Sequence, residues 1–176
     1  MYQGYFKRIF DLSFSILLFI VFLPIFPLII WISYCYTGSP IFTQKRIGSK
    51  GKMFNIYKFR SLLIGRESDQ KRQYSFGNIL RKYGVDELPQ LYNIIKNEMS
   101  FVGPRPLLSI RNKKNAKIRN NVKPGITGLS QVNGNTLLTL KKKMYFDLKY
   151  IQDISLKNDL IIIFKTILIV LCGKKT

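Results

Sequence analysis

The sequence contains no histidine and only nine carboxylate side chains among 176 residues. Without histidine there is no imidazole general base near neutral pH, which excludes Ser-His-Asp hydrolases and histidine-metal mechanisms. Its two cysteines, Cys35 and Cys172, indicate neither a disulfide framework nor a thiolate metal site, so a reducing compartment is expected. Any catalytic acid or metal ligand must therefore be one of the carboxylates: Asp11, Glu67, Asp69, Asp86, Glu87, Glu98, Asp147, Asp153 and Asp159.

Positive charge is concentrated after the first 44 residues. The net charge is +20, of which residues 1–44 carry +1 and the other 132 residues carry +19. Such a surface attracts polyanions, which include nucleic acid, anionic lipid head groups and phosphorylated substrates. The length suits one compact domain with an appendage.

A long apolar segment, residues 12–36, predicts a membrane anchor. As one straight helix it would reach roughly 37 Å, enough to cross a hydrocarbon core of about 30 Å. Pro24 lies at its midpoint, where it removes a backbone donor and clashes with the carbonyl of Ile20. Basic residues flank both ends, which favours placing both ends in the cytoplasm. The segment alone leaves open a re-entrant broken helix and a single span with a proline kink.

The remainder predicts a mixed α/β fold that is mainly helical, with little β structure. Residues 41–58 alternate like two short strands around the turn at 48–51, whereas 86–99 and 141–151 have helical spacing, with Asp86 as the N-cap of the first helix. Residues 160–172 are too short to span a membrane, so they form either an amphipathic interfacial helix or a buried helix or strand. We predict two regions: residues 1–40 as a re-entrant membrane helix with its flanks, and residues 41–176 as the cytosolic-face domain.

Asp86 and Glu87 are the only adjacent carboxylates in the chain. At a helix N-terminus, backbone N–H groups and the helix dipole would keep Asp86 ionised and would attract a phosphate. An ionised aspartate can act as a nucleophile on phosphorus while its neighbour helps to hold a divalent cation. The alternative is a plain helix cap.

Arg105 follows Asp86 by 19 residues and lies between Pro104 and Pro106. Prolines on both sides restrict the backbone, and a restrained guanidinium can bind phosphate oxygens in bidentate fashion. The alternative is an extended connector with an exposed arginine.

Three other basic residues, Lys58, Arg60 and Arg81, could balance the charge of a diphosphate or form a solvated face that attracts anionic lipid. The KPGITG stretch, residues 123–128, is either a backbone loop that approaches a nucleotide or a tight turn.

These motifs occur in an order that resembles the monotopic phosphoglycosyl transferases, the bacterial sugar transferase family, and especially its small members that consist of the catalytic domain. The resemblance runs from Phe6 to about Ile163 through the blocks FKRIFD, IFTQKRIGSKGKMFNIYKFRS, DELPQLYNIIKNEMSFVGPRPLL, KPGITGLSQVNG, and FDLKYI with DLIII. Five blocks in this order are highly specific.

The resemblance implies a re-entrant helix broken at Pro24 and transfer of a phosphosugar from a UDP-sugar to polyprenyl (undecaprenyl) phosphate, with Mg²⁺ required and UMP released. It places the enzyme at the cytoplasmic face of the bacterial inner membrane, at the first membrane step of glycoconjugate assembly. In that scheme Asp86 attacks the sugar-bearing phosphorus and forms a covalent intermediate, and Glu87 supports the metal. Arg105 orients the phosphate, and Asp147 supports catalysis. The metal site would comprise Asp86 and Glu87, and the substrate-binding residues would be Lys58, Arg60, Arg81, Pro104, Pro106 and Gln131.

The chain departs from the family pattern in two places. Leu23 precedes the break proline where family members often have serine, so no hydroxyl is available there for the Ile20 carbonyl. Residues 109–121 are basic and polar where acidic and aromatic residues are usual, which leaves sugar and nucleotide contacts in that stretch open.

Two other classes of protein compete with this interpretation. The charge of +19 on 132 residues, with 10 Tyr and 13 Phe, would also suit a membrane-anchored nucleic-acid-binding protein, although no binding motif is recognisable. The third hypothesis is a noncatalytic scaffold protein with the same fold. For the enzyme we expect anionic membrane lipids as partners and no nucleic acid. The sequence leaves open which sugar is transferred and which polyprenyl phosphate accepts it. It also leaves open whether the chain forms a homo-oligomer.

Overall fold

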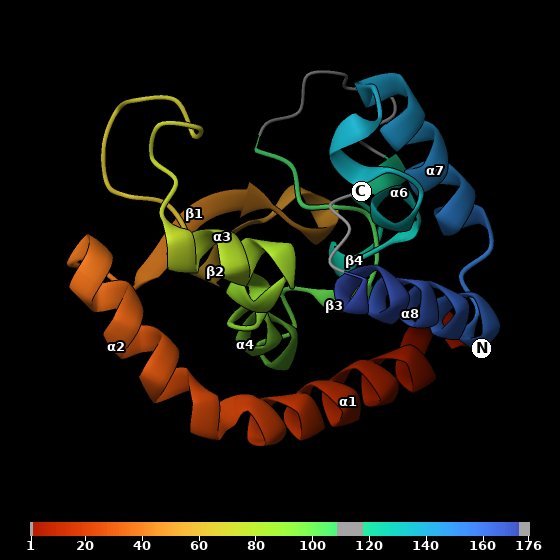
Figure 1. The fold of residues 1–176 in the computed structure, drawn as a ribbon. Coiled ribbons are helices and arrows are strands. Elements are labelled where there is room, and N and C mark those ends of the chain that lie inside the picture. Colours follow the sequence, from red (N-terminus) through yellow and green to blue (C-terminus); the bar gives the residue numbers. More distant parts are fainter. Residues whose placement is uncertain (1, 109–117, 173–176) are drawn as a thin grey trace.

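Two N-terminal helices curve around one side of a small mixed domain in the computed structural model, which describes residues 2–108 and 118–172 (Figure 1). A π-helical turn, Tyr2–Phe6, leads into α1 (Lys7–Phe22), and α2 (Phe26–Thr37) follows after a break. By length and composition, Tyr2–Thr37 could cross a membrane. This apolar helical region agrees with the predicted anchor.

The break between α1 and α2 is a 3₁₀ turn, Leu23–Ile25, centred on Pro24. Proline has no N–H to donate to the Ile20 carbonyl, and that oxygen accepts the N–H of Leu23 instead. The N–H of Phe26 in turn bonds to the Leu23 carbonyl. The backbone thus satisfies the Ile20 carbonyl without a side-chain hydroxyl at position 23.

Both halves of the broken helix pack on the same domain. Leu18 and Phe19 of α1 lie against the core cluster around Ile94. Phe26 and Ile29 of α2 are buried in a second cluster, which they share with residues of β2 and α3. Chain direction reverses after α2, where Gly38 adopts the left-handed conformation with φ 65°.

Among the residues that the structure describes, the domain has two small sheets with helices around them, so the mixed, mainly helical fold is confirmed. The predicted hairpin is present as β1 (Ile41–Ile47) and β2 (Met53–Phe59), paired antiparallel with Gln44 opposite Ile56. A second sheet pairs β3 (Ser100–Val102) in parallel with β4 (Gly125–Thr127). The α-helices in the described part of the domain are α3 (Ser75–Lys82), α4 (Gln90–Ile95), α6 (Leu129–Val132), α7 (Leu140–Gln152) and α8 (Leu156–Leu171).

The helix expected over residues 86–99 differs in the structure. A 3₁₀ turn, η4 (Val85–Glu87), precedes the short α4, and Gly84 is the N-cap of η4, so the expectation that Asp86 caps a helix was wrong. Pro89 is the physical reason: it cannot donate to the Val85 carbonyl, which accepts the N–H of Leu88 instead.

Helix α8 accounts for residues 160–171 of the C-terminal apolar segment. Ile162 and Ile163 are buried in the core, whereas the side chains on the other face are exposed, including Phe164, which is 62% exposed. The segment is therefore both a core helix and a helix with an exposed apolar face.

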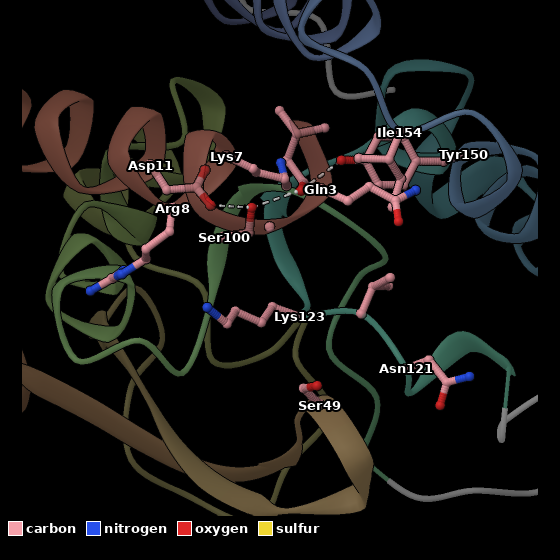
Figure 2. A pocket seen from close by; sticks show the side chains of 13 residues that line it. Gln3, Lys7, Arg8, Asp11, Ser49, Ser100, Asn121, Lys123, Tyr150 and Ile154 are labelled. Carbon is pink, nitrogen blue, oxygen red and sulfur yellow. Dashed lines mark hydrogen bonds between the residues drawn. The ribbon is translucent and has the colours of Figure 1, made fainter. Parts of the chain in front are cut away.

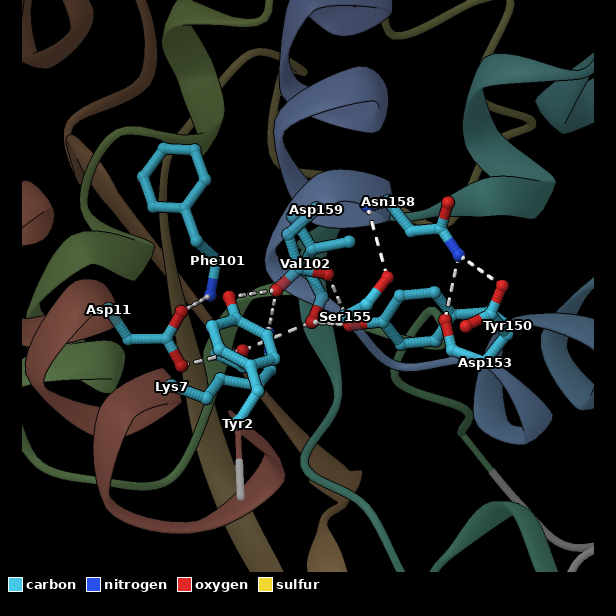
Figure 3. Close-up of polar contacts among 11 residues, drawn as sticks. Tyr2, Lys7, Asp11, Phe101, Val102, Tyr150, Asp153, Ser155, Asn158 and Asp159 are labelled. Atoms are coloured by element: carbon cyan, nitrogen blue, oxygen red, sulfur yellow. Dashed lines mark hydrogen bonds and ion pairs between the residues drawn. The ribbon is translucent and has the colours of Figure 1, made fainter.

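A buried polar network joins the first turn of α1 to α8 (Figure 3). Asp159 is fully buried and accepts hydrogen bonds from Lys7 Nζ at 2.5 Å, Tyr2 Oη at 2.7 Å and Tyr150 Oη at 2.8 Å. Asp11, also buried, accepts from Ser100 Oγ at 2.7 Å and from the Phe101 N–H at 3.0 Å.

Arg8 makes the third link between α1 and the domain. Its guanidinium donates to the carbonyl oxygens of Ile94 at 2.6 Å and Ile95 at 3.0 Å, at the C-terminal end of α4. A cation at that end also interacts favourably with the helix dipole. The polar residues that precede the apolar part of α1 thus fix the anchor to the domain.

Asp159→Asn should destabilise the protein strongly, because it leaves the buried ammonium of Lys7 without its carboxylate. Losing one partner of a buried ion pair costs about 3–5 kcal/mol, so thermal unfolding in detergent should show a Tm lower by several degrees. The matched control is Asp153→Asn, at an exposed carboxylate that accepts a hydrogen bond from Asn158. Equal Tm values for the two variants would contradict the assigned role of Asp159.

Candidate active site

A cavity of about 870 Å³ opens beside η4. Its walls come from β1, β2, α3, η4, the loop after β3, β4, α6 and α8, so it lies where most elements of the domain meet. Seven of the ten residues predicted from the sequence line it: Lys58, Arg60, Arg81, Asp86, Glu87, Arg105 and Gln131.

Asp86 presents an unpaired carboxylate to this cavity. Its side chain is 9% exposed, and in the described part of the chain it accepts no hydrogen bond from another residue. Burial, and then the neighbouring charge of Glu87, raise the pKa of Asp86 to about 6, although Lys58 and Arg81 act in the opposite direction. The backbone enters this turn through Gly84, whose φ of 64° is unfavourable for other residues.

Glu87 is held as an anion by cations. It forms an ion pair with Lys58 of β2, and Arg105 lies close enough to affect its titration. Burial alone would raise the pKa of Glu87, but Lys58 and Arg105 outweigh burial, so the pKa lies below its usual value. The two adjacent carboxylates therefore differ: Glu87 is paired, whereas Asp86 is available to react.

The backbone of residues 104–107 is fixed at every carbonyl oxygen by a hydrogen bond. Pro104 and Pro106 are both buried, whereas the side chain of Arg105 between them is exposed. The four donors are the Gly125 N–H to Pro104, Arg119 Nη2 to Arg105, Arg46 Nη1 to Pro106 and the Ile47 N–H to Leu107. Pro104 and Pro106 do not line the cavity but hold Arg105 at its wall.

The guanidinium of Arg105 has a polar partner in the lining of the cavity. Its Nη1 donates to Asn135 Oδ1 at 2.7 Å, and both residues line the cavity. This hydrogen bond uses one N–H donor of the Arg105 guanidinium. The remaining N–H groups can still bind a phosphate.

Asp147 lies behind this wall and does not line the cavity. It is buried, and it accepts from Arg119 Nε at 2.7 Å and Ser130 Oγ at 2.9 Å. Burial raises the pKa of Asp147, against the effects of Arg119 and Ser130. Because Arg119 also donates to the Arg105 carbonyl, Asp147 is linked to the cavity wall through Arg119.

Arg60 lines the cavity, but its guanidinium serves the backbone. It donates to the carbonyl oxygens of Ser39 at 2.6 Å and Ile41 at 3.1 Å, which fixes the segment between α2 and β1. Arg81 and Gln131 also line the cavity, with the charge of Arg81 acting on Asp86.

Arg46, Arg119 and Asn135 contribute to the site but were not predicted from the sequence. Each of them contacts a residue that is distant in the sequence. The largest separation is 60 positions, between Arg46 and Pro106. Arg46 and Arg119 lie within basic stretches where no local pattern distinguishes them from solvated arginines.

The KPGITG stretch allows a close approach of two backbones. A Cβ at Gly125 would lie 2.1 Å from the Gly103 nitrogen, and one at Gly128 would lie 2.1 Å from the Gly103 oxygen. The stretch forms β4 and brings Thr127 to the cavity wall. Packing between β3 and β4 is therefore sufficient to explain these glycines.

The cavity combines a cationic region with an apolar wall. Arg46, Lys58, Arg81 and Arg105 supply positive charge, whereas Ile169 and Val170 of α8 contribute apolar side chains. Such a cavity can take a ligand that carries phosphate groups and an apolar portion.

The carboxylates of Asp86 and Glu87 fit a Mg²⁺ ion that keeps several waters. Within the described residues there is no group of three Asp, Glu, Cys or His side chains that could hold a metal. Mg²⁺ is usually bound by one or two carboxylates together with substrate phosphates, so two carboxylates next to phosphate-binding cations match its requirements.

The sequence matches, over residues 2–173, the model of a family described as "Bacterial sugar transferase". It is 40% identical over 172 residues to "Uncharacterized sugar transferase EpsL" of Bacillus subtilis (strain 168), covering 92% of this chain and 85% of that protein. It is 35% identical over 192 residues to "Undecaprenyl-phosphate galactose phosphotransferase" of Salmonella typhimurium (strain LT2), covering 94% of this chain and 40% of that one. With "UDP-glucose:undecaprenyl-phosphate glucose-1-phosphate transferase" of Klebsiella pneumoniae it shares 38% identity over 183 residues, covering 92% and 39%. The chain therefore spans less than half the length of the latter two relatives.

Asp86→Asn should raise stability at pH 8 in metal-free buffer, because it removes a buried, unpaired negative charge. With a folded pKa of about 6, above the value of the unfolded chain, ionisation of Asp86 destabilises the fold by on the order of 2 kcal/mol above pH 6. The Tm of the variant should therefore exceed that of the wild type at pH 8, and the difference should shrink as pH falls from 6 towards 4. Glu67→Gln, at an exposed carboxylate, is the control. A Tm difference that does not change with pH would contradict the assigned environment.

Proposed function

Because the chain belongs to the bacterial sugar transferase family, we propose that it moves a phosphosugar from a UDP-sugar to undecaprenyl phosphate or a related polyprenyl phosphate and releases UMP. The printed names of several relatives, which include undecaprenyl-phosphate galactose and glucose phosphotransferases, support this reaction class. The observation that carries the proposal is the unpaired carboxylate of Asp86 in a cavity lined by cationic side chains.

In the first step, Asp86 attacks the sugar-bearing phosphorus of the UDP-sugar. A bond forms between a carboxylate oxygen and this phosphorus, and the bond to the bridging oxygen of the diphosphate breaks, so that UMP leaves. In the second step, a phosphate oxygen of the polyprenyl phosphate attacks the same phosphorus and releases the aspartate. Nucleophilic catalysis of this kind needs no histidine.

The cations of the cavity make this attack by an anion feasible. Arg105 and Arg81 lie where they can neutralise phosphate oxygens, and Arg105 is positioned through its fixed backbone. Lys58 keeps Glu87 ionised and in place. Preorganised charges of this kind stabilise a transition state without the cost of reorienting solvent.

We propose Asp86 and Glu87 as the residues that hold Mg²⁺. When bound, this ion supplies charge neutralisation at the diphosphate oxygens and at the leaving phosphate. Glu87 suits the role of ligand because its lowered pKa keeps it ionised at neutral pH.

The membrane segment supports a re-entrant topology. Both α1 and α2 pack on the same domain, and β1 begins four residues after α2 ends. A helix that crossed the membrane would carry its far end about 30 Å away from the side where it entered. Lys7 and Arg8 on one flank and Lys45 and Arg46 on the other favour the cytoplasmic face of the inner membrane for both ends.

Asp86→Asn should abolish UMP release and prevent trapping of a phosphosugar on the protein, while membrane association stays intact. The assay uses the purified chain with undecaprenyl phosphate, a panel of UDP-sugars and Mg²⁺, followed by intact-protein mass spectrometry. Glu87→Gln and Arg105→Ala should lower turnover by at least about 100-fold, as for other removed transition-state contacts. Asp153→Asn serves as the control with wild-type turnover. UMP release by Asp86→Asn at the wild-type rate would exclude the covalent route.

Asp147→Asn should lower kcat by about tenfold or more, because it loosens Arg119 and with it the backbone carbonyl of Arg105. A positioning role predicts non-additivity: in the Arg105→Ala background, Asp147→Asn should cost little more. The measurement is kcat and KM for the four members of this double-mutant cycle. Additive losses in the cycle would show that Asp147 acts independently of Arg105.

A further inference from the structure

A second, smaller cavity lies beneath the first turn of α1, separate from the active site (Figure 2). Its volume is about 200 Å³, and it shares no lining residue with the active-site cavity among the described residues. Three cationic side chains line it: Lys7 and Arg8 from α1 and Lys123 from the segment before β4. The function proposed above makes no use of this cavity.

The positive charge around this cavity is only partly compensated. Lys7 is neutralised by Asp159, but Arg8 donates to the carbonyl oxygens of α4 and Lys123 to the amide oxygen of Asn97, all of them uncharged acceptors. Asp11 is the one carboxylate in the described lining, and both of its oxygens accept hydrogen bonds from other groups, Ser100 Oγ and the Phe101 N–H.

The pKa of Lys123 also indicates that positive charge in the cavity is incompletely compensated. Burial and then the charges of Arg8 and Lys7 lower the pKa of Lys123, against the opposing charge of Asp11. An anion in the cavity would offset this repulsion and add a charged acceptor to the uncharged acceptors that Arg8 and Lys123 already have. An arginine and a lysine in the lining of one small cavity match a phosphate group in particular.

The surroundings of the cavity relate it to the membrane. Tyr5, Phe6 and Ile9, on the same helical segment as Lys7 and Arg8, are 76%, 57% and 44% exposed. These three side chains do not line the cavity, but their exposure indicates that the start of α1 lies at the lipid boundary, where phosphate head groups are found.

We propose that this cavity binds a phosphate group between Arg8 and Lys123, at a site independent of the active site. The phosphate can come from a phospholipid head group or from free phosphate in solution. The exposed apolar residues on the same helical segment favour the phospholipid as its source.

The test measures dissociation constants for the full chain purified in detergent. The probes are dioctanoyl phosphatidylglycerol, inorganic phosphate, and dioctanoylglycerol as the lipid without phosphate. Lys123→Gln should raise the Kd for the phosphate-containing probes by about tenfold, which is the usual effect of losing one charge-assisted hydrogen bond. Lys141→Gln, at an exposed lysine on α7, is the matched charge control, and Arg105→Ala tests for binding in the active-site cavity; both should keep the wild-type Kd.

Each outcome bears on the proposal. Tighter binding of phosphatidylglycerol than of inorganic phosphate, with dependence on Lys123, supports the lipid source, and the reverse order supports free phosphate in the same site. Wild-type Kd values for both phosphate probes in Lys123→Gln overturn the proposal, as does the absence of saturable binding to the wild-type chain. Loss of binding in Arg105→Ala alone also overturns it, because the probe then occupies the active site.

A second measurement needs no substitution. Acetylation of Lys123 in the wild-type chain, followed by mass spectrometry, should slow several-fold when either phosphate probe is present, whereas acetylation of Lys141 should not change. Equal protection of both lysines would contradict the site. Because neither measurement involves turnover, failure of this proposal is distinguishable from failure of the proposed transferase reaction.

Discussion

Hydrogen bonds to every carbonyl oxygen from residue 104 to residue 107 fix the backbone on which the candidate active site is built. The donors come from the β1–β2 hairpin, from β4 and from Arg119, which α7 holds in turn through Asp147. Parts of the chain that are far apart in sequence therefore determine where the guanidinium of Arg105 lies. Proline on either side suits this segment, because every carbonyl finds a donor and the prolines themselves have no N–H to satisfy.

Asp86 and Glu87 show how neighbours in sequence acquire different properties from their surroundings. Glu87 faces Lys58 and Arg105, which favour its ionised form, whereas Asp86 is buried without a partner. In the proposed reaction, Glu87 stays ionised in its ion pair, whereas the carboxylate of Asp86 is the one that can react with a phosphate. The unpaired state of Asp86 lowers stability, which is a common property of catalytic groups.

The sequence was most informative where the pattern is local. Alternation over residues 41–58 predicted the hairpin, helical spacing predicted α7, and Asp86, Glu87 and Arg105 were identified as candidates that now line one cavity. Strands β3 and β4 are three residues each, too short to show a period, and their pairing depends on glycines that permit close backbone approach. The contacts of Arg46 and Arg119 depend on the tertiary fold, so no spacing in the sequence could indicate them.

The packing of α2 has a consequence for any attempt to obtain a soluble form of this protein. Phe26 and Ile29 complete a core cluster with Phe59 and Leu80, and Asp11 satisfies the hydroxyl of Ser100 and the N–H of Phe101. The boundary near residue 40 marks a change in composition, but the hydrophobic interior crosses it. Truncation there would expose apolar side chains of β2 and α3 and leave buried donors unsatisfied, so the N-terminal helices are an integral part of the folded domain and not a detachable tether.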